Sequence, residues 1–268
     1  MLRHRSLKAL TSRTYGASRW LLARERRWLL FLAAGLVALG TFGELSEDLI
    51  EDDELLAMDT RLLKKVASLR TPFLTIHAVD LTALGSLTLL ALVVLVAGVP
   101  LVRLGNRRGA LQLVLAMLGV GLWTYLTKNV FSRARPDLVY RLLDVSGYSF
   151  PSGHSSGSAA LYVTLALVLR RHVRTLHGRT LLVAGCSAMA LAIGLSRVYL
   201  GVHYPSDVAS GLCFGTGWAL LLAAAFEWQP ITSVAAAVVG PNTGESTDAP
   251  EPDTDDPGSD DLDDLERK

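Results

Sequence analysis

The chain contains only two cysteines among its 268 residues. Cys186 and Cys213 both lie within long apolar stretches, and neither is spaced with a partner as metal ligands are, so the sequence predicts neither a disulfide framework nor redox chemistry. No cluster of Asp and Glu accompanies the polar motifs described below, and no internal repeat of fixed period is evident. We therefore expect no metal and no other cofactor.

What the chain has in abundance is apolar residues, half of the total, gathered in long runs rather than in periodic stripes. A bilayer-spanning helix needs about 20 mainly apolar residues, and the sequence predicts an all-α bundle of six transmembrane helices. The predicted spans are Trp28 to Ser46, Leu81 to Val102, Ala110 to Thr127, Ser155 to Leu169, Leu181 to Val198 and Val208 to Phe226. The fourth is short and rich in Ser and Gly, which suits a helix packed inside the bundle against a polar site.

Residues 54–70 predict an amphipathic helix that lies on the outer membrane interface. Its apolar residues recur at spacings of three and four between charged positions: Leu55, Met58, Leu62, Val66 and Leu69. A lid, or an element through which lipid reaches the site, is the alternative interpretation.

The two ends of the chain differ in charge from the 28–227 membrane domain and from each other. Residues 1–27 carry many Lys and Arg, whereas residues 228–268 are rich in Pro, Gly, Ser, Thr and acids. We interpret the basic segment as a topogenic signal that touches anionic lipid, not as a nucleic-acid-binding tail, and the first span as uncleaved. The acidic tail is expected to be disordered, with a partner-binding role as the alternative interpretation.

The basic residues also predict the orientation, because loops retained in the cytoplasm carry the Lys and Arg excess. Basic residues are dense before Trp28 and in the turns after the second and fourth spans, including Arg103, Arg107, Arg108, Arg170, Arg171, Arg174 and Arg179. We therefore expect a multi-pass protein of the cell membrane with both termini cytoplasmic. The polar motifs fall on the opposite, extracytoplasmic face, although the basic residues between 61 and 70 weaken the asymmetry.

Three short stretches predict a single anion site. They are Lys128 with Arg135-Pro136, then Pro151-Ser152-Gly153-His154, and then Ser196-Arg197 with His203 and Asp207. Together they supply cations for phosphate oxygens, a nucleophile, an acid for the leaving group and a carboxylate to orient the nucleophile. This combination is typical of phosphoryl transfer.

The two histidines are assigned different roles. A carboxylate four residues after His203 can fix its tautomer and stabilise the cation formed on attack, so we predict that His203 is the nucleophile and Asp207 its orienting partner. His154 follows a Pro-Ser-Gly turn at the start of a helix, where backbone N–H groups favour an anion. Protonated, it can donate its proton to the leaving group.

The remaining site residues are predicted to bind the phosphate. Arg135 and Arg197 offer planar forks that match two oxygens, and Lys128 adds a point charge. Gly153 lets the backbone approach closely, and Ser152 can add a hydroxyl donor. Arg133 is interpreted as a solvated or headgroup-contacting charge.

With these motifs, the chain resembles the type 2 phosphatidic acid phosphatase superfamily over roughly residues 55–227. The three-part signature of that family is complete here as Lys128 to Pro136, Pro151 to His154 and Ser196 to Asp207. The resemblance implies a six-helix bundle and metal-independent dephosphorylation through a phosphohistidine on His203. It also implies inhibition by vanadate, because soluble haloperoxidases of the superfamily bind vanadate in the same pocket.

The substrate stays open, because the signature contacts only phosphate. Isoprenoid diphosphates such as undecaprenyl diphosphate, phosphatidic acid and phosphatidylglycerol phosphate all fit, and nucleic acid is not an expected partner. Two rival classes remain: a lipid phosphotransferase using the same site, and a non-catalytic lipid transporter or scaffold. The oligomeric state is likewise open.

Overall fold

The computed structural model describes residues 27–51 and 53–228, and every regular element within them is a helix. The elements are α2 (Arg27–Glu51), α3 (Asp53–Ser68), α4 (Pro72–Ala83), α5 (Leu87–Arg103), α6 (Arg107–Phe131), the 3-10 turn η1 (Leu138–Tyr140), α7 (Gly153–Leu169), α8 (Leu176–Tyr199) and α9 (Pro205–Glu227). Apart from Arg27 and Trp228, the predicted basic segment 1–27 and acidic tail 228–268 lie outside the described residues.

Four of these helices, α2, α6, α8 and α9, are long and apolar enough to cross a membrane. The pair α4 and α5 passes the same test together, with a bend of 57° between the two helices. The predicted fourth span, α7, is apolar but has only 17 residues. A multi-pass membrane protein is therefore supported with four to five candidate spans, and a sixth span stays a prediction.

The predicted second span, Leu81 to Val102, is wrong as a single helix. Thr71 caps α4, with Pro72 as its first residue, and α4 ends at Ala83. Ser86 then caps α5 by accepting a hydrogen bond from the Leu89 N–H. The sequence is apolar on both sides of this break, and the break itself consists of Leu84, Gly85 and Ser86, so hydropathy alone did not reveal it.

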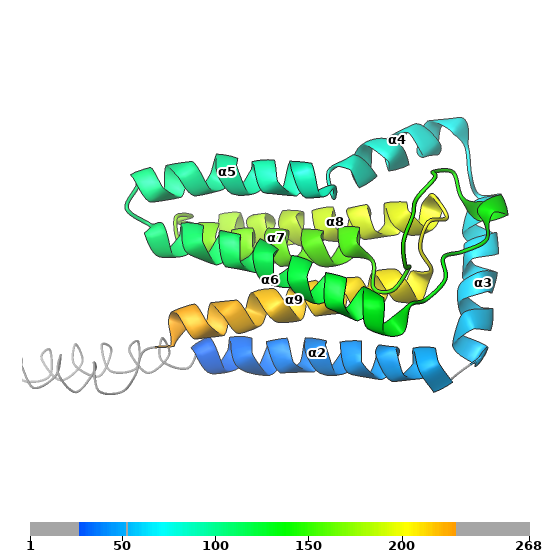
Figure 1. The fold of residues 1–268 in the computed structure, drawn as a ribbon. Coiled ribbons are helices and arrows are strands. Elements are labelled where there is room, and N and C mark those ends of the chain that lie inside the picture. The colour runs from blue at the N-terminus through cyan, green and yellow to red at the C-terminus, as the bar shows by residue number, and fades with distance from the viewer. Residues whose placement is uncertain (1–26, 52, 229–268) are drawn as a thin grey trace, which may run out of the picture. The chain divides into compact units, whose positions relative to one another are not determined.

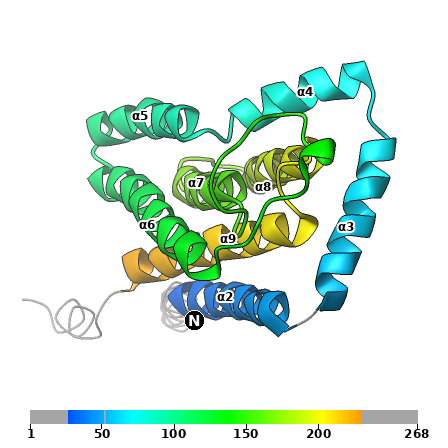
Figure 2. The same cartoon turned by 45° about the vertical axis from the view of Figure 1, so that its right-hand side comes forward.

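The predicted amphipathic helix is confirmed as α3, but the residues that it buries differ from the predicted set of apolar residues. Leu55 and Leu63 are buried, and Asp59 is fully buried between them at four-residue spacing. Met58, Leu62 and Leu69 are exposed. Figures 1 and 2 show α3 running across one end of the bundle, roughly perpendicular to the long helices.

The Ser- and Gly-rich helix α7 lies inside the bundle, as predicted. Its residues from Ser155 to Leu161 are all buried, and α9 packs along it. A Cβ at Gly211 would lie 2.7 Å from the Ser152 carbonyl oxygen, and one at Gly215 would overlap that of Ser156. Small residues thus let the two backbones approach closely, as expected for helices that associate by packing in lipid.

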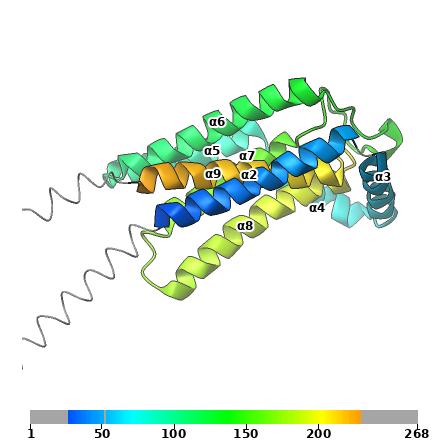
Figure 3. The same cartoon turned by 90° about the horizontal axis from the view of Figure 1, so that it is seen from below.

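The outer helices complete the bundle. Helix α2 runs beside α9 (Figure 3), while a leucine-rich core joins α5, α6 and α7. The Arg-bearing turns between α5 and α6 and between α7 and α8 lie at one end of the bundle. Helix α3 and the long α6–α7 loop lie at the other (Figure 1).

Candidate active site

The polar motifs meet at the end of the bundle beside α3. Lys128 lies in the last turn of α6, Arg197 in the last turn of α8 and Asp207 in the first turn of α9. The turn before His203 depends on Gly201, whose φ of 73° favours glycine and at which a Cβ would overlap the carbonyl oxygen of Tyr140. Helix ends and tight turns thus carry residues that are far apart in the sequence to one place.

His203 and Asp207 form the predicted pair. Pro205 begins α9 between them, and the Nδ1 of His203 lies 3.5 Å from a carboxylate oxygen of Asp207. That oxygen also accepts hydrogen bonds from the Tyr204 N–H at 2.9 Å and from the Ser149 hydroxyl at 2.5 Å. The side chains of His203 and Asp207 are both buried, with 2% and 0% exposure. The carboxylate therefore faces Nδ1 and leaves Nε2 of His203 for chemistry.

The free nitrogen of His203 faces a cation. Its Nε2 lies 3.2 Å from an Arg135 guanidinium nitrogen. Burial lowers the pKa of His203 to about 4, an effect that Arg135 and Arg197 strengthen and Asp207 opposes. A lowered pKa favours the neutral imidazole, so His203 carries a lone pair for attack throughout the neutral pH range.

Backbone carbonyls hold two of the predicted phosphate-binding cations. The Lys128 ammonium donates to the Tyr148 carbonyl at 2.5 Å. The Arg135 guanidinium donates to the carbonyls of Gly147 at 2.9 Å and Val202 at 2.8 Å. The loop before α7 and the turn before α9 therefore position both cations around His203.

The third cation and the second histidine lie against the break between α4 and α5. Arg197 is buried and donates to the Thr82 hydroxyl at 2.7 Å, while its Nε finds no partner within the described residues. A Cβ at Gly85 would lie 3.1 Å from the His154 ring. The break that the sequence did not predict thus supports two site residues.

Ser152 and Gly153 open α7 as predicted, with one difference. Ser152 is fully buried, and its hydroxyl caps α7 by accepting from the Ser155 N–H at 3.5 Å and also accepts from the Ser155 hydroxyl at 2.9 Å. It therefore fixes the helix start, and donation to a phosphate stays a prediction. At Gly153, an added Cβ would come within 4 Å of one described atom beyond its chain neighbours and its own helix backbone, a Thr124 methyl at 3.7 Å. The protein itself leaves room there for a close backbone approach by a ligand.

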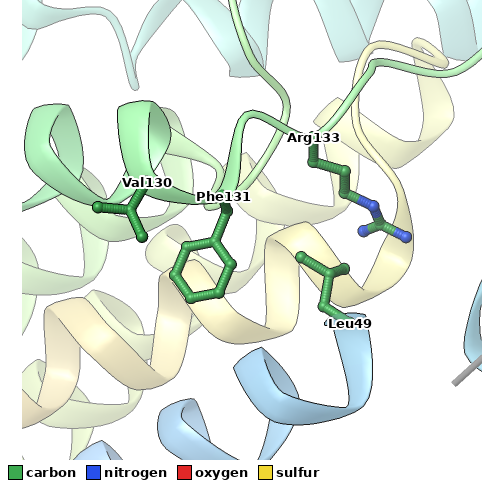
Figure 4. A pocket seen from close by; sticks show the side chains of 4 residues that line it. All are labelled: Leu49, Val130, Phe131 and Arg133. Atoms are coloured by element: carbon green, nitrogen blue, oxygen red, sulfur yellow. The ribbon is translucent and has the colours of Figure 1, made fainter. Parts of the chain in front are cut away.

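Arg133 is not the solvated charge that the sequence suggested. Its side chain is 10% exposed and pairs with Asp207 at 2.6 Å and with Asp59 at 2.8 Å. Burial opposes the charge, but the two carboxylates outweigh it and raise the pKa of Arg133. Arg133 also lines a cavity of about 320 Å³ with Leu49, Val130 and Phe131 (Figure 4).

Sequence reasoning missed Ser149 and Arg133 as partners of Asp207, and Thr82 as the partner of Arg197. It also missed Ser206 and Asp59 as partners of Arg133. One signal was available for Asp59. It lies four residues after Leu55 and four before Leu63, so an acid occupies a helix face that is otherwise apolar.

Comparison with known proteins agrees with this site. The model of the PAP2 superfamily matches residues 109–231, which contain all three motifs. Phosphatidylglycerophosphatase B of Bacillus subtilis is 30% identical over 169 residues, covering 62% of this chain and 82% of the relative. Lipid A 1-phosphatase of Rhizobium johnstonii is 37% identical over 115 residues, and the chain spans less than half of its length, 43%.

The fold is shared as well. A transmembrane PAP2-type phosphatidylglycerolphosphate phosphatase from Bacillus subtilis, known from its crystal structure, superposes with a TM-score of 0.67 at 27% identity. The superposition covers 70% of this chain and 94% of that one. The predicted family is confirmed, and with it the phosphatase class of enzyme: the chain belongs to the PAP2 superfamily.

Proposed function

We propose that the protein is an integral membrane lipid phosphatase that hydrolyses a phosphomonoester or diphosphate of a lipid through a phosphohistidine on His203. The observation that carries the proposal is the orientation of His203, with Nδ1 facing Asp207 and Nε2 facing Arg135. Attack on a phosphate requires a nucleophile held by an orienting carboxylate, and a cation beside it that can bind the phosphate oxygens.

The reaction follows from this orientation in two steps. The Nε2 lone pair of His203 forms the N–P bond while the P–O bond to the lipid breaks, and His154 donates a proton to the departing oxygen. Asp207 stabilises the imidazolium that results, and Lys128, Arg135 and Arg197 bind the phosphate oxygens. Water, deprotonated by His154, then cleaves the N–P bond and releases inorganic phosphate.

The substrate class rests on the relatives and on the membrane setting. The relative that aligns over most of the chain is named for phosphatidylglycerophosphate, and a second for lipid A. We therefore propose a lipid whose phosphate lies at the extracytoplasmic face, with phosphatidylglycerol phosphate, phosphatidic acid and undecaprenyl diphosphate as the candidates to compare.

The test is phosphate release by purified protein in detergent from these three lipids, with a metal chelator present. We expect release from at least one lipid without added metal, and inhibition by vanadate. Release that strictly needs added divalent metal contradicts the mechanism. Release that needs an added alcohol acceptor indicates a phosphotransferase instead.

Replacing His154 should affect substrates unequally. A lipid alkoxide needs a proton to depart, whereas para-nitrophenolate does not, so we expect His154→Ala to lower kcat on a lipid phosphate by at least about tenfold more than on para-nitrophenyl phosphate. Steady-state rates on the paired substrates measure this. Equal losses on both would leave His154 as a phosphate-binding residue only.

The proposed topology places both termini in the cytoplasm and the site outside. Val139 in the α6–α7 loop is 80% exposed, and Leu104 in the α5–α6 turn is 74% exposed. In intact cells we expect Val139→Cys to react with an impermeant thiol reagent and Leu104→Cys to react only after lysis, because Arg-rich turns remain inside. A cysteine placed after Thr247 should behave like Leu104→Cys. The reverse pattern would place the site in the cytoplasm.

A further inference from the structure

A buried chain of ion pairs connects α3 to the catalytic pair. Asp59, on α3, is fully buried and accepts hydrogen bonds from the Ser206 N–H at 3.0 Å and from the Ser206 hydroxyl. It also accepts from Arg133 at 2.8 Å. Each of these partners donates to Asp59, which is the pattern of contacts that a carboxylate accepts. Residue 59 lies outside the residues that match the family model.

Arg133 lies between Asp59 and Asp207 in this series of ion pairs. One guanidinium nitrogen binds Asp59, and the other binds Asp207 at 2.6 Å and the Ser206 hydroxyl at 2.8 Å. The guanidinium also lies over the Tyr204 ring, 4.4 Å from its centroid. These contacts fix the Asp207 oxygen that does not face His203, and so fix the carboxylate plane.

The arrangement has an electrostatic consequence. Arg133 and Asp207 alone would form a neutral pair, and a neutral pair stabilises a neighbouring imidazolium poorly. Asp59 adds a second negative charge, so the three groups together carry one net negative charge. Attack by His203 creates one positive charge beside them, which this net charge offsets in a buried setting where charges interact strongly.

We propose that Asp59 is a positioning residue for the reaction: by pairing with Arg133 it offsets the guanidinium charge and so restores the negative charge with which Asp207 stabilises the imidazolium of His203. This inference rests on the proposed function, since it needs a reaction that charges His203. It gives α3 a role in the chemistry although α3 carries no residue of the three motifs.

The competing explanation is that Asp59 only fastens α3 to the bundle. The two differ in what a second substitution does. Asp59→Asn leaves the pair of Arg133 and Asp207 with no net charge. Combining Asp59→Asn with Arg133→Gln leaves one negative charge, on Asp207. A fastening role predicts that the double variant is worse than the single one, and a charge role predicts recovery.

The experiment measures kcat, KM and melting temperature of the full-length protein in detergent, on a substrate that the wild type hydrolyses. For Asp59→Asn we expect kcat to fall on the order of tenfold with KM nearly unchanged, since one unit charge near the imidazolium is lost. The double variant should recover to within about threefold of the wild type. Asp144→Asn, the same charge change at an exposed loop residue, is the control.

A second matched pair guards against folding defects. Asp59→Glu and Asp59→Gln have side chains of equal length and differ in charge, and we expect the Glu variant to be about tenfold faster. Equal rates for this pair, or a double variant slower than Asp59→Asn, would overturn the proposal. These outcomes concern ratios between variants, so they are distinct from a wild type that releases no phosphate, which would reject the proposed function itself.

Discussion

Replacing His203 by alanine is expected to lower turnover by about 10⁴-fold or more while leaving the fold intact, because the substitution removes the nucleophile itself. The side chain is buried, but its Nδ1 contacts are with Asp207 and Ser149, which also bind each other. That carboxylate therefore keeps other partners when the imidazole is gone. Phosphate release and melting temperature, measured on the same preparation, check both parts.

Two variants make this result interpretable. His77→Ala removes an exposed histidine from α4 and should leave turnover unchanged. Asp207→Asn removes the orienting charge but not the nucleophile, so we expect weak residual turnover. Retention of more than about one hundredth of the wild-type rate by His203→Ala would rule out covalent catalysis at this residue.

Replacing Arg197 by lysine should lower kcat/KM by about 10²- to 10³-fold, although the charge is kept. Arg197 uses one arm of its guanidinium on the Thr82 hydroxyl, and its buried Nε keeps a donor free. A planar fork can bind Thr82 and a phosphate oxygen at the same time. An ammonium at this position has neither the shape nor the reach to do both.

Arg61→Lys provides the matched control for this substitution, since Arg61 is exposed on α3 and the same change should be silent there. Thr82→Val tests the hydrogen bond between Thr82 and Arg197 separately. It keeps the guanidinium but removes the hydroxyl that accepts from it, so we expect a smaller loss of kcat/KM than for Arg197→Lys. If Arg197→Lys retained most of the activity, charge alone would suffice and the geometric argument would be wrong.

The sequence predicted that the motif residues lie together, but not which side chains hold them in place. The motif spacings place Lys128, Arg197 and Asp207 at helix ends, and helix ends are where a bundle exposes polar groups, so convergence followed from the pattern. Arg133 and Asp59 lie 74 residues apart, and neither carries a local signal of its partner. A pairing over that distance depends on how α3 crosses the bundle, which hydropathy does not contain.

In the fold, too, some features were predicted from the sequence and others were not. Apolar runs predicted α2, α6, α8 and α9 with small boundary errors, because length and composition decide whether a helix can span a bilayer. The break between α4 and α5 was missed since its residues, Leu84, Gly85 and Ser86, are common within apolar helices as well. The packing at the break is tertiary: Gly85 lies so close to Ile193 that a Cβ would come within 2.5 Å of that side chain.

The carbonyl oxygens around Lys128 and Arg135 make phosphate binding an exchange of partners. An arriving phosphate takes donors that already have acceptors, so its net gain is the difference between two sets of hydrogen bonds. The departing phosphate returns those donors to the same carbonyls. We therefore expect inorganic phosphate to leave easily after each turnover, because the emptied cations are never left without oxygen partners.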